Sequence, residues 1–175
     1  TAPYDRSIDV GSVLFSTPEM IENALTSAHS YYEYWNNTEV DQRAQCLNNL
    51  ADLLEDNMPE LIALCHQEAG KTIHDCIDEV REAVDFCRYY GQQAIYNLSF
   101  SEANVSFDNI IQEVRRKGKG VFVCISPWTF PLAIFLGQIS AALVTGNTVI
   151  AKPAEQTSLI AARAVTLMLE AGFPE

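Results

Sequence analysis

Residues 120–157 read GVFVCISPWTFPLAIFLGQISAALVTGNTVIAKPAEQT, and this stretch decides the fold class. Residues 120–125 (GVFVCI) form an apolar, β-rich run that is typical of a strand covered on both faces. Residues 131–145 are expected to be helical, and residues 148–151 (TVIA) predict a second buried strand. A strand, a helix and another strand at this spacing predict a parallel sheet with a right-handed crossover.

The half of the chain before this stretch predicts helices. Three threonines mark expected helix starts: Thr17 before a proline, and Thr38 and Thr72, each with an acid three residues on. A further helix is expected to end at Gly70, a residue type that favours helix C-termini. The helices are predicted over residues 17–35, from about 38 to 54, 59–70 and 72–94.

The whole pattern predicts an α/β fold over residues 1–175, with no linker dividing it. A helical portion (about 17–98) is followed by a possible arm or hairpin strand (104–116) and by a βαβα portion (119–172). Thr157 is expected to cap the last helix. The βαβα portion would form the first part of a parallel, Rossmann-like cofactor sheet.

Charge and hydropathy exclude two classes of partner. The chain has 11 Lys+Arg against 23 Asp+Glu, a formal net charge of -12, which disfavours nucleic acid and anionic membrane surfaces. Residues 120–151 carry no charge, but prolines and a Gly-Asn pair leave only residues 132–144 uninterrupted. That run is too short to span a bilayer, so no transmembrane span is expected.

The cysteines indicate a reducing compartment and no metal site. The chain holds five, an odd number without framework spacing, and residues 1–9 lack the apolar run of a secretory signal. We therefore expect a cytoplasmic protein with mostly buried thiols. Cys124 lies inside a predicted strand and is expected to be inert. The cysteines are Cys46, Cys65, Cys76, Cys87 and Cys124.

Ligands of open parallel sheets bind beyond the carboxyl ends of the strands. Residues 125–131 and 152–157 fall there. Lys152 and Glu155 could bracket a ribose diol as donor and acceptor, and Trp128 could form a wall for the nicotinamide half of a dinucleotide. The alternative is that Lys152 and Glu155 are a solvated loop pair and Trp128 belongs to the core.

Two other patterns carry no chemistry at this stage. Gly70-Lys71-Thr72 imitates the end of a phosphate-binding loop, but Cys65 stands where its first glycine would be, and its flanks are helical. A row of acids is assigned to the solvated side of a helix: Asp75, Asp78, Glu79, Glu82 and Asp85.

Residues 120–157 are similar to the aldehyde dehydrogenase superfamily through SPW-x-FP followed by GN-x-V-x-AKPAEQT. Residues 68–94 (EAGKTIHDCIDEVREAVDFCRYYGQQA) resemble one branch, the pyrroline-5-carboxylate (glutamate semialdehyde) dehydrogenase module of bifunctional proline utilization A proteins. The resemblance extends from about Ile21 onward and is weakest in residues 1–20 and 97–114.

The resemblance implies an NAD-dependent dehydrogenase that converts glutamate γ-semialdehyde to glutamate. It also implies fusion to an FAD-dependent proline dehydrogenase module outside this chain, and a homo-oligomer. Glu82 and Phe130 fall at substrate-contacting positions. The positions implied for NAD are Ile125, Ser126, Pro127, Trp128, Lys152 and Glu155.

Two departures leave alternatives open. Thr129 stands where the family pattern has an asparagine whose amide helps to hold the oxyanion of the tetrahedral intermediate, and losing one such donor costs about 3 kcal/mol. The nucleophilic cysteine and the general-base glutamate would lie after Glu175, so the chain is interpreted as an N-terminal fragment that is inactive alone and needs the remainder of its parent. A dehydrogenase for another small aldehyde and a catalytically silent module of the same fold remain alternatives.

Overall fold

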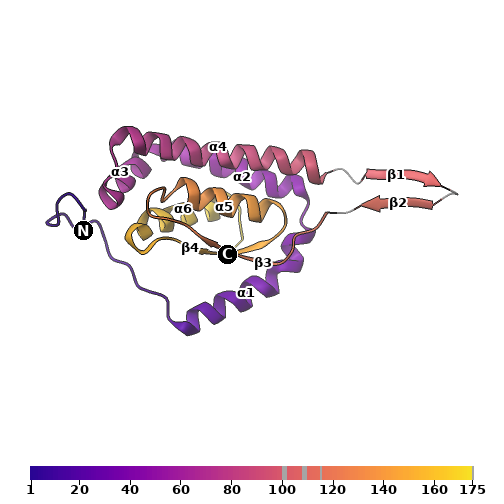
Figure 1. Ribbon diagram of the computed structural model, residues 1–175, viewed down its shortest axis with the longest axis horizontal. Helices are drawn as coiled ribbons and strands as arrows, with labels where there is room; N and C mark the ends of the chain where they lie inside the picture. The colour runs from indigo at the N-terminus through magenta and orange to yellow at the C-terminus, as the bar shows by residue number, and fades with distance from the viewer. Residues whose placement is uncertain (100–101, 108–109, 115, 175) are drawn as a thin grey trace.

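The computed structural model describes residues 1–99, 102–107, 110–114 and 116–174 (Figure 1). Helices and strands follow the predicted order, with a helical first half and an α/β second half. The elements are α1 (Pro18–Asn37), α2 (Val40–Asp56), α3 (Met58–Ala69), α4 (Ile73–Leu98), β1 (Glu102–Phe107), β2 (Ile110–Val114), β3 (Val121–Ile125), α5 (Ala133–Val144), β4 (Thr148–Lys152), the short 3₁₀ helix η1 (Glu155–Thr157) and α6 (Ser158–Glu170).

Three predicted helix ends are confirmed. The Thr17 hydroxyl accepts a hydrogen bond from the Met20 amide at 3.3 Å, and the Thr72 hydroxyl accepts one from the Asp75 amide at 3.2 Å. Both threonines therefore satisfy an amide that the first helical turn leaves unbonded. Gly70 ends α3 in the left-handed conformation with φ 69°, which a residue without a side chain adopts at little cost.

The prediction that Thr38 starts a helix is wrong. Thr38 follows the last residue of α1, and its amide donates to the carbonyls of Trp35 and Tyr34. Its hydroxyl also donates to the Tyr34 carbonyl, at 3.1 Å. The unbonded carbonyls at the end of α1 thus use both donors of Thr38, and α2 begins after Glu39 without a side-chain cap.

Thr157 stands at the N-cap position of α6 as predicted, but its side chain forms no capping hydrogen bond. Its hydroxyl is buried and has no partner among the described residues. The Glu68 carboxylate takes this role instead, accepting from the amides of Leu159 at 2.7 Å and Ile160 at 2.9 Å. A carboxylate at a helix N-terminus is favoured by both hydrogen bonding and the helix dipole, so α3 sets where α6 begins.

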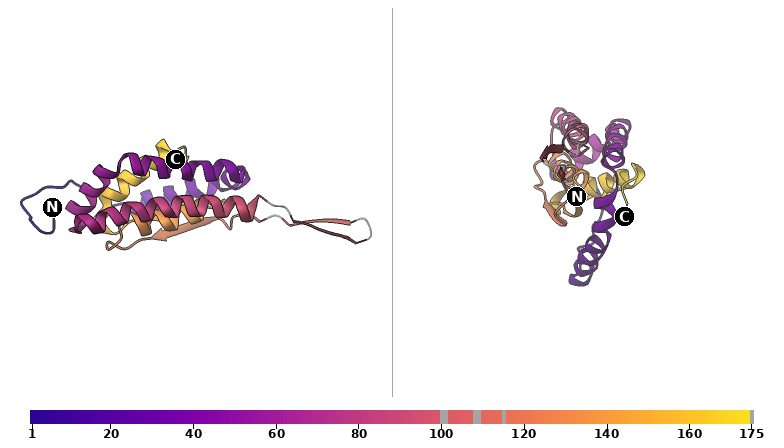
Figure 2. Two further views of the ribbon diagram at one scale, coloured as in Figure 1. Left: turned by 90° about the horizontal axis from the view of Figure 1, so that it is seen from above. Right: turned by 90° about the vertical axis from the view of Figure 1, so that its right-hand side faces the viewer.

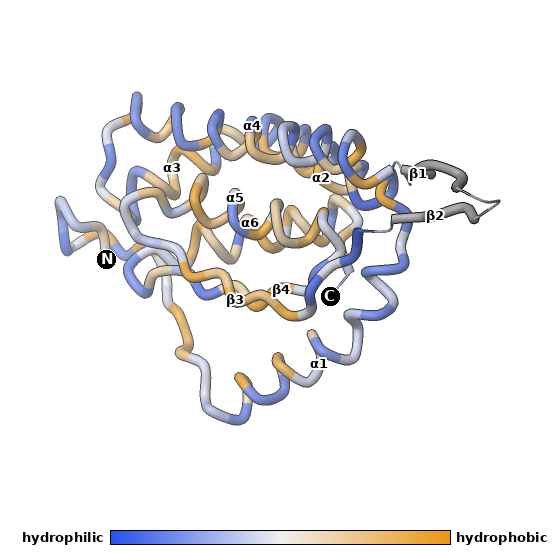
Figure 3. The backbone as a smooth tube through the Cα atoms, turned by 45° about the vertical axis from the view of Figure 1, so that its right-hand side comes forward, coloured by the Kyte–Doolittle hydropathy of each residue, from blue (hydrophilic) through white to orange (hydrophobic). Residues whose placement is uncertain are grey.

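The predicted parallel pairing of the two apolar strands is confirmed. β3 and β4 pair in register from Val121 opposite Thr148 to Ile125 opposite Lys152. The expectation that β3 is covered on both faces is wrong for the described residues. Cys124 is buried, whereas Val123 is 57% exposed and Ile125 is 63% exposed. Helix α5 covers one side of the pair, and Figure 3 shows both strands as apolar segments.

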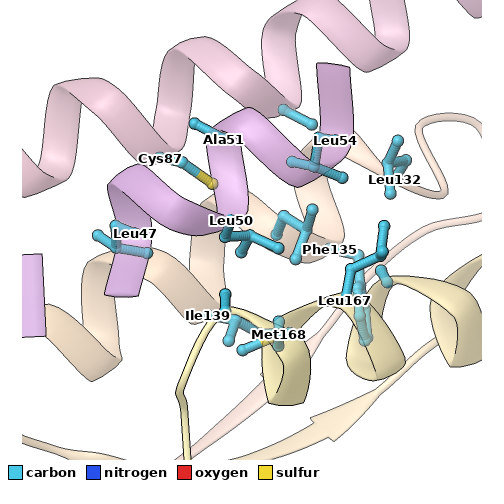
Figure 4. Packing of buried hydrophobic residues seen from close by; sticks show 14 of the residues in the cluster. Leu47, Leu50, Ala51, Leu54, Cys87, Leu132, Phe135, Ile139, Leu167 and Met168 are labelled. Carbon is cyan, nitrogen blue, oxygen red and sulfur yellow. The ribbon is translucent and has the colours of Figure 1, made fainter. Parts of the chain in front are cut away.

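A single apolar core joins the helical half to the α/β half (Figure 4). Leu50 from α2, Phe135 and Ile139 from α5 and Leu167 from α6 converge there and are all buried. The indole of Trp35 donates to the Leu143 carbonyl at 2.9 Å and ties the end of α1 to the same core. Residues of both halves that the structure describes therefore share one core.

The predicted arm is an antiparallel hairpin. β1 pairs with β2, with Glu102 opposite Val114, and the hairpin lies beyond the end of α4, away from the other elements (Figures 1 and 2). Within the described part of the chain, none of the helices combines the length and the apolar character that crossing a bilayer requires.

Candidate functional site

The carboxyl ends of β3 and β4 lie side by side and define the site. Ile125 is opposite Lys152, and the Ser126 amide donates to the Lys152 carbonyl at 3.2 Å. The segments that follow, residues 126–131 and 153–157, therefore leave the sheet at the same edge. The two sequence stretches that we expected to contact a ligand are brought together.

The polar part of this edge comes from the β4 side. Lys152 is the last residue of β4 and Glu155 begins η1, and both are exposed. No ion pair joins the two residues to each other in the parts of the chain that the structure describes. An ammonium and a carboxylate at neighbouring positions leave a donor and an acceptor available to the same ligand.

The apolar part comes from the β3 side. Ile125, Trp128 and Phe130 are 63%, 50% and 42% exposed, so the alternative that Trp128 belongs to the core is wrong. Pro127 is half-buried between them, and the Ser126 hydroxyl is buried without a hydrogen-bond partner among the described residues. Such a cluster offers an apolar wall with an unused polar group at its base.

Lys71 contacts this loop, and our sequence analysis missed it. Its ammonium donates to the Thr129 carbonyl at 2.9 Å and lies 4.2 Å from the centre of the Phe130 ring. The same ammonium lies 3.7 Å from a carboxylate oxygen of Glu79. In the sequence, Lys71 stands out only as part of a rejected phosphate-binding pattern, and nothing in its position there indicates the long-range contact.

The assignment of Glu79 to a solvated helix face is wrong. Its side chain is fully buried where α4 packs near the start of α5. Spacing could have shown this, because Cys76 and Ala83, three residues before and four after, lie on the same buried face. The other four acids of the row are exposed as expected, Glu82 among them.

Burial raises the pKa of Glu79 to about 7. Lys71 acts in the opposite direction, as do the amides of Ala133 and Leu132, which favour the charged form without completing a hydrogen bond to either oxygen. The negative charge of Glu82 on the next turn of α4 raises the pKa further. Glu79 is therefore a carboxyl group that can hold a proton near neutral pH.

Burial disfavours the thiolate form of the cysteines of this chain. Burial raises the pKa of every one of the five thiols, to about 11 for Cys87, so each stays protonated at neutral pH. Cys124 is buried in β3, as predicted for an inert core thiol. Four of the five side chains are buried and Cys46 is half-buried.

An apolar groove of about 400 Å³ lies elsewhere, between α1, β4 and α6. Its walls include Tyr31, Val149, Val165 and Phe173. None of the predicted site residues lines it, so the groove is separate from the edge at Ile125 and Lys152.

Comparison with known proteins identifies the family of this chain. The family model described as "Aldehyde dehydrogenase family" matches residues 1–175. This chain belongs to the aldehyde dehydrogenase family. It is 48% identical over 172 residues to the bifunctional protein PutA of Escherichia coli K12, covering 98% of this chain and 12% of that protein. It is 34% identical over 175 residues to the 1-pyrroline-5-carboxylate dehydrogenase of Bacillus cytotoxicus, covering 98% of this chain and 33% of that protein.

Solved structures of the same branch have the same fold as this aldehyde dehydrogenase chain. A structure of proline utilization A with proline bound in remote sites superposes with a TM-score of 0.92 at 45% identity, covering 93% of this chain and 17% of the other. The 1-pyrroline-5-carboxylate dehydrogenase from Thermus with bound NAD gives 0.87 at 33% identity, covering 91% and 31%. The resemblance to this branch and the α/β fold class are confirmed, and the chain spans only part of its relatives' length.

Proposed function

We propose that the chain forms the first part of an NAD-dependent dehydrogenase that oxidises L-glutamate γ-semialdehyde to L-glutamate in proline catabolism. The observation that supports it most is the joint edge of β3 and β4, where exposed apolar and charged side chains meet at Ile125 and Lys152. In this proposal the full-length protein also holds an FAD-dependent proline dehydrogenase module, and this chain alone is inactive.

The residues at the edge fit NAD. Lys152 and Glu155 would bind the two hydroxyls of the adenosine ribose, one as donor and one as acceptor. Ile125, Pro127 and Trp128 would pack against the dinucleotide, and the unused hydroxyl of Ser126 supplies a further polar contact. When bound, NAD would accept a hydride from the substrate. A carboxylate beside the ribose disfavours the extra phosphate of NADP, so NAD is the expected cofactor.

The substrate side would use Glu82 and Phe130. Glutamate γ-semialdehyde carries an α-ammonium group, and an exposed carboxylate at Glu82 is a suitable partner for it. Phe130 would pack against the aliphatic part of the substrate. Thr129 would offer its hydroxyl to the oxyanion that forms when the aldehyde carbonyl is attacked.

The cofactor assignment is tested on the full-length protein with Glu155→Ala. Loss of a charged acceptor at the ribose removes about 1.5–3 kcal/mol of binding, so KM for NAD should rise about tenfold or more. Glu170→Ala, at an exposed acid at the other end of α6, is the matched control and should leave KM for NAD unchanged. An unchanged KM in the Glu155→Ala protein would refute the assignment.

The substrate assignment is tested with Glu82→Ala, again in the full-length protein. kcat/KM for glutamate γ-semialdehyde should fall about tenfold or more, because the α-ammonium loses its charged partner, while propanal oxidation stays the same. Asp85→Ala, at an exposed acid on the next turn of α4, is the control. If Glu82→Ala leaves glutamate semialdehyde kinetics untouched, a dehydrogenase for another small aldehyde becomes the better account.

A further inference from the structure

Lys71 joins the helical part of the chain to the loop after β3. Its ammonium reaches three groups: the Thr129 carbonyl at 2.9 Å, the Glu79 carboxylate at 3.7 Å and the face of Phe130 at 4.2 Å. Only 14% of the side chain is exposed. An ammonium has three N–H bonds, and a carbonyl, a carboxylate and an aromatic face are each favourable partners for one of them.

The main chain at Lys71 is also fixed. Gly70 turns the chain sharply at the end of α3, and Nδ1 of His66 donates to the Lys71 carbonyl at 2.7 Å. Tyr4 stacks on the His66 ring with 5.1 Å between the ring centres. The base of the side chain is therefore held from α3 while its tip is held by the loop.

Glu79 lies behind the ammonium. Its side chain is fully buried, and one of its carboxyl oxygens lies 3.7 Å from the Lys71 ammonium, on the side of α4. A lysine with a long flexible stem otherwise samples many rotamers, and a buried partner restricts them. With its hydrogen bond on the Thr129 carbonyl and with Glu79 and Phe130 beside it, the ammonium links α4 to the loop after β3.

We propose that Lys71, held by Glu79, is a positioning residue that fixes Thr129 and Phe130 for aldehyde oxidation. The inference rests on the proposed function, because it assumes that Thr129 and Phe130 face the substrate. The bond to the Thr129 carbonyl fixes the main chain from which the Thr129 hydroxyl projects. The contact with Phe130 fixes the ring beside it, so one cation orients two neighbouring site residues.

The kinetic test compares Lys71→Met with Lys71→Arg in the full-length protein. Small displacements of reacting groups cost up to about a hundredfold in rate, so Lys71→Met should lower kcat about tenfold or more. KM for NAD should stay within about twofold, since Lys152 and Glu155 are untouched. Lys71→Arg keeps the charge and the donors and should recover most of kcat. Lys117→Met, at an exposed lysine, is the control.

A second measurement does not depend on activity. Amide hydrogen exchange in the peptide covering residues 126–132 should be faster in the Lys71→Met protein than in the unmodified protein, with Lys71→Arg in between. The double variant Lys71→Met, Glu79→Gln leaves neither ionisable group buried without its partner, so we expect it to fold. It should show the same fall of kcat and the same faster exchange as Lys71→Met.

Three results would overturn the proposal. They are unchanged amide exchange in that peptide of the Lys71→Met protein, an equal loss of kcat in the Met and Arg variants, or an unchanged kcat with a rise only in KM for NAD. If the unmodified protein oxidises no aldehyde, the proposed function fails. The hydrogen-exchange result then still decides whether Lys71 fixes the loop.

Discussion

At the scale of single residues, the two acids Glu79 and Glu82 show how much the exposure of a side chain changes within one helical turn. They lie three residues apart on α4, yet Glu79 is fully buried and Glu82 is exposed. Burial raises the pKa of Glu79 to about 7. Glu79 belongs to the packing near the loop, and Glu82 is available to a ligand.

Glu79 makes stability depend on pH. Its pKa rises from an ordinary 4.5 to about 7 on folding, so the folded state holds the proton more tightly. Its stabilising contribution is complete below the unfolded pKa and is lost as pH rises through 7. We expect Glu79→Gln, which stays neutral, to remove about 3 kcal/mol of pH dependence from the free energy of unfolding. Urea unfolding of the native protein and of Glu79→Gln at a series of pH values measures this difference. The same dependence of the free energy of unfolding on pH in both proteins would contradict the prediction.

Thr129 gives a prediction about rate. An asparagine amide reaches further than a threonine hydroxyl, and one oxyanion donor is worth about a hundredfold in kcat. We expect Thr129→Asn to raise kcat of the full-length protein about tenfold, less than the full value because a hydroxyl remains in the native protein. Steady-state kinetics at saturating NAD measure the change. A native protein that is inactive, and stays so in the variant, would show that position 129 is not the cause.

At the scale of elements, α6 depends on α3. The Glu68 carboxylate binds the amides of Leu159 and Ile160, although burial raises its pKa. We expect Glu68→Ala to lower the free energy of unfolding by about 1–2 kcal/mol, the usual cost of a lost helix cap. Glu60→Ala, which removes a half-exposed ion pair between α3 and Arg163 of α6, is the control and should cost at most about 1 kcal/mol. Equal losses in the two variants would contradict the capping role.

Local signals predicted elements better than they predicted long-range contacts. The Thr17 and Thr72 caps and the apolar runs of β3 and β4 depend on nearby residues, and each was predicted. Thr38 has the right residue type but bonds the end of α1 instead. Thr157 makes no side-chain capping bond, and the amides of α6 are bound by Glu68, 91 residues before Leu159 in the chain. Lys71 was missed for the same reason, since its bond to Thr129 joins residues 58 positions apart.

The position of the candidate site at one edge of the sheet could be predicted from the sequence, because sheet topology determines it. Parallel strands end at one edge, so residues 125–131 and 152–157 had to meet there. The helical spacing of α4 was enough to predict that Glu79 is buried, because Glu79 lies between Cys76 and Ala83 on one helix face. The sequence analysis placed Glu79 in solvent because it is an acidic residue. The role given to Glu82 came from family resemblance, those of Lys152 and Glu155 came from the strand ends as well as from the resemblance, and all three stay predictions.

At the scale of the whole molecule, the open face of the strand pair stands out. Val123 and Ile125 lie on the same face of β3 and are both exposed, and single-copy soluble chains seldom leave such an apolar face uncovered. We expect this chain, expressed by itself, to self-associate at concentrations of about 10 μM and above. Val123→Lys should reduce association, and Tyr34→Lys, at an exposed site on α1, should not. Light scattering after size-exclusion chromatography measures it, and a monomer at all concentrations would contradict the expectation.

We propose that the full-length protein prefers glutamate γ-semialdehyde as its substrate. The most direct test measures NADH formation with glutamate γ-semialdehyde, beside succinate semialdehyde and propanal at matched concentrations. We expect kcat/KM to be highest for glutamate γ-semialdehyde, because only this aldehyde carries the α-ammonium group that Glu82 would bind. Preference for either other aldehyde, or no turnover of any aldehyde by a folded protein, would contradict the account.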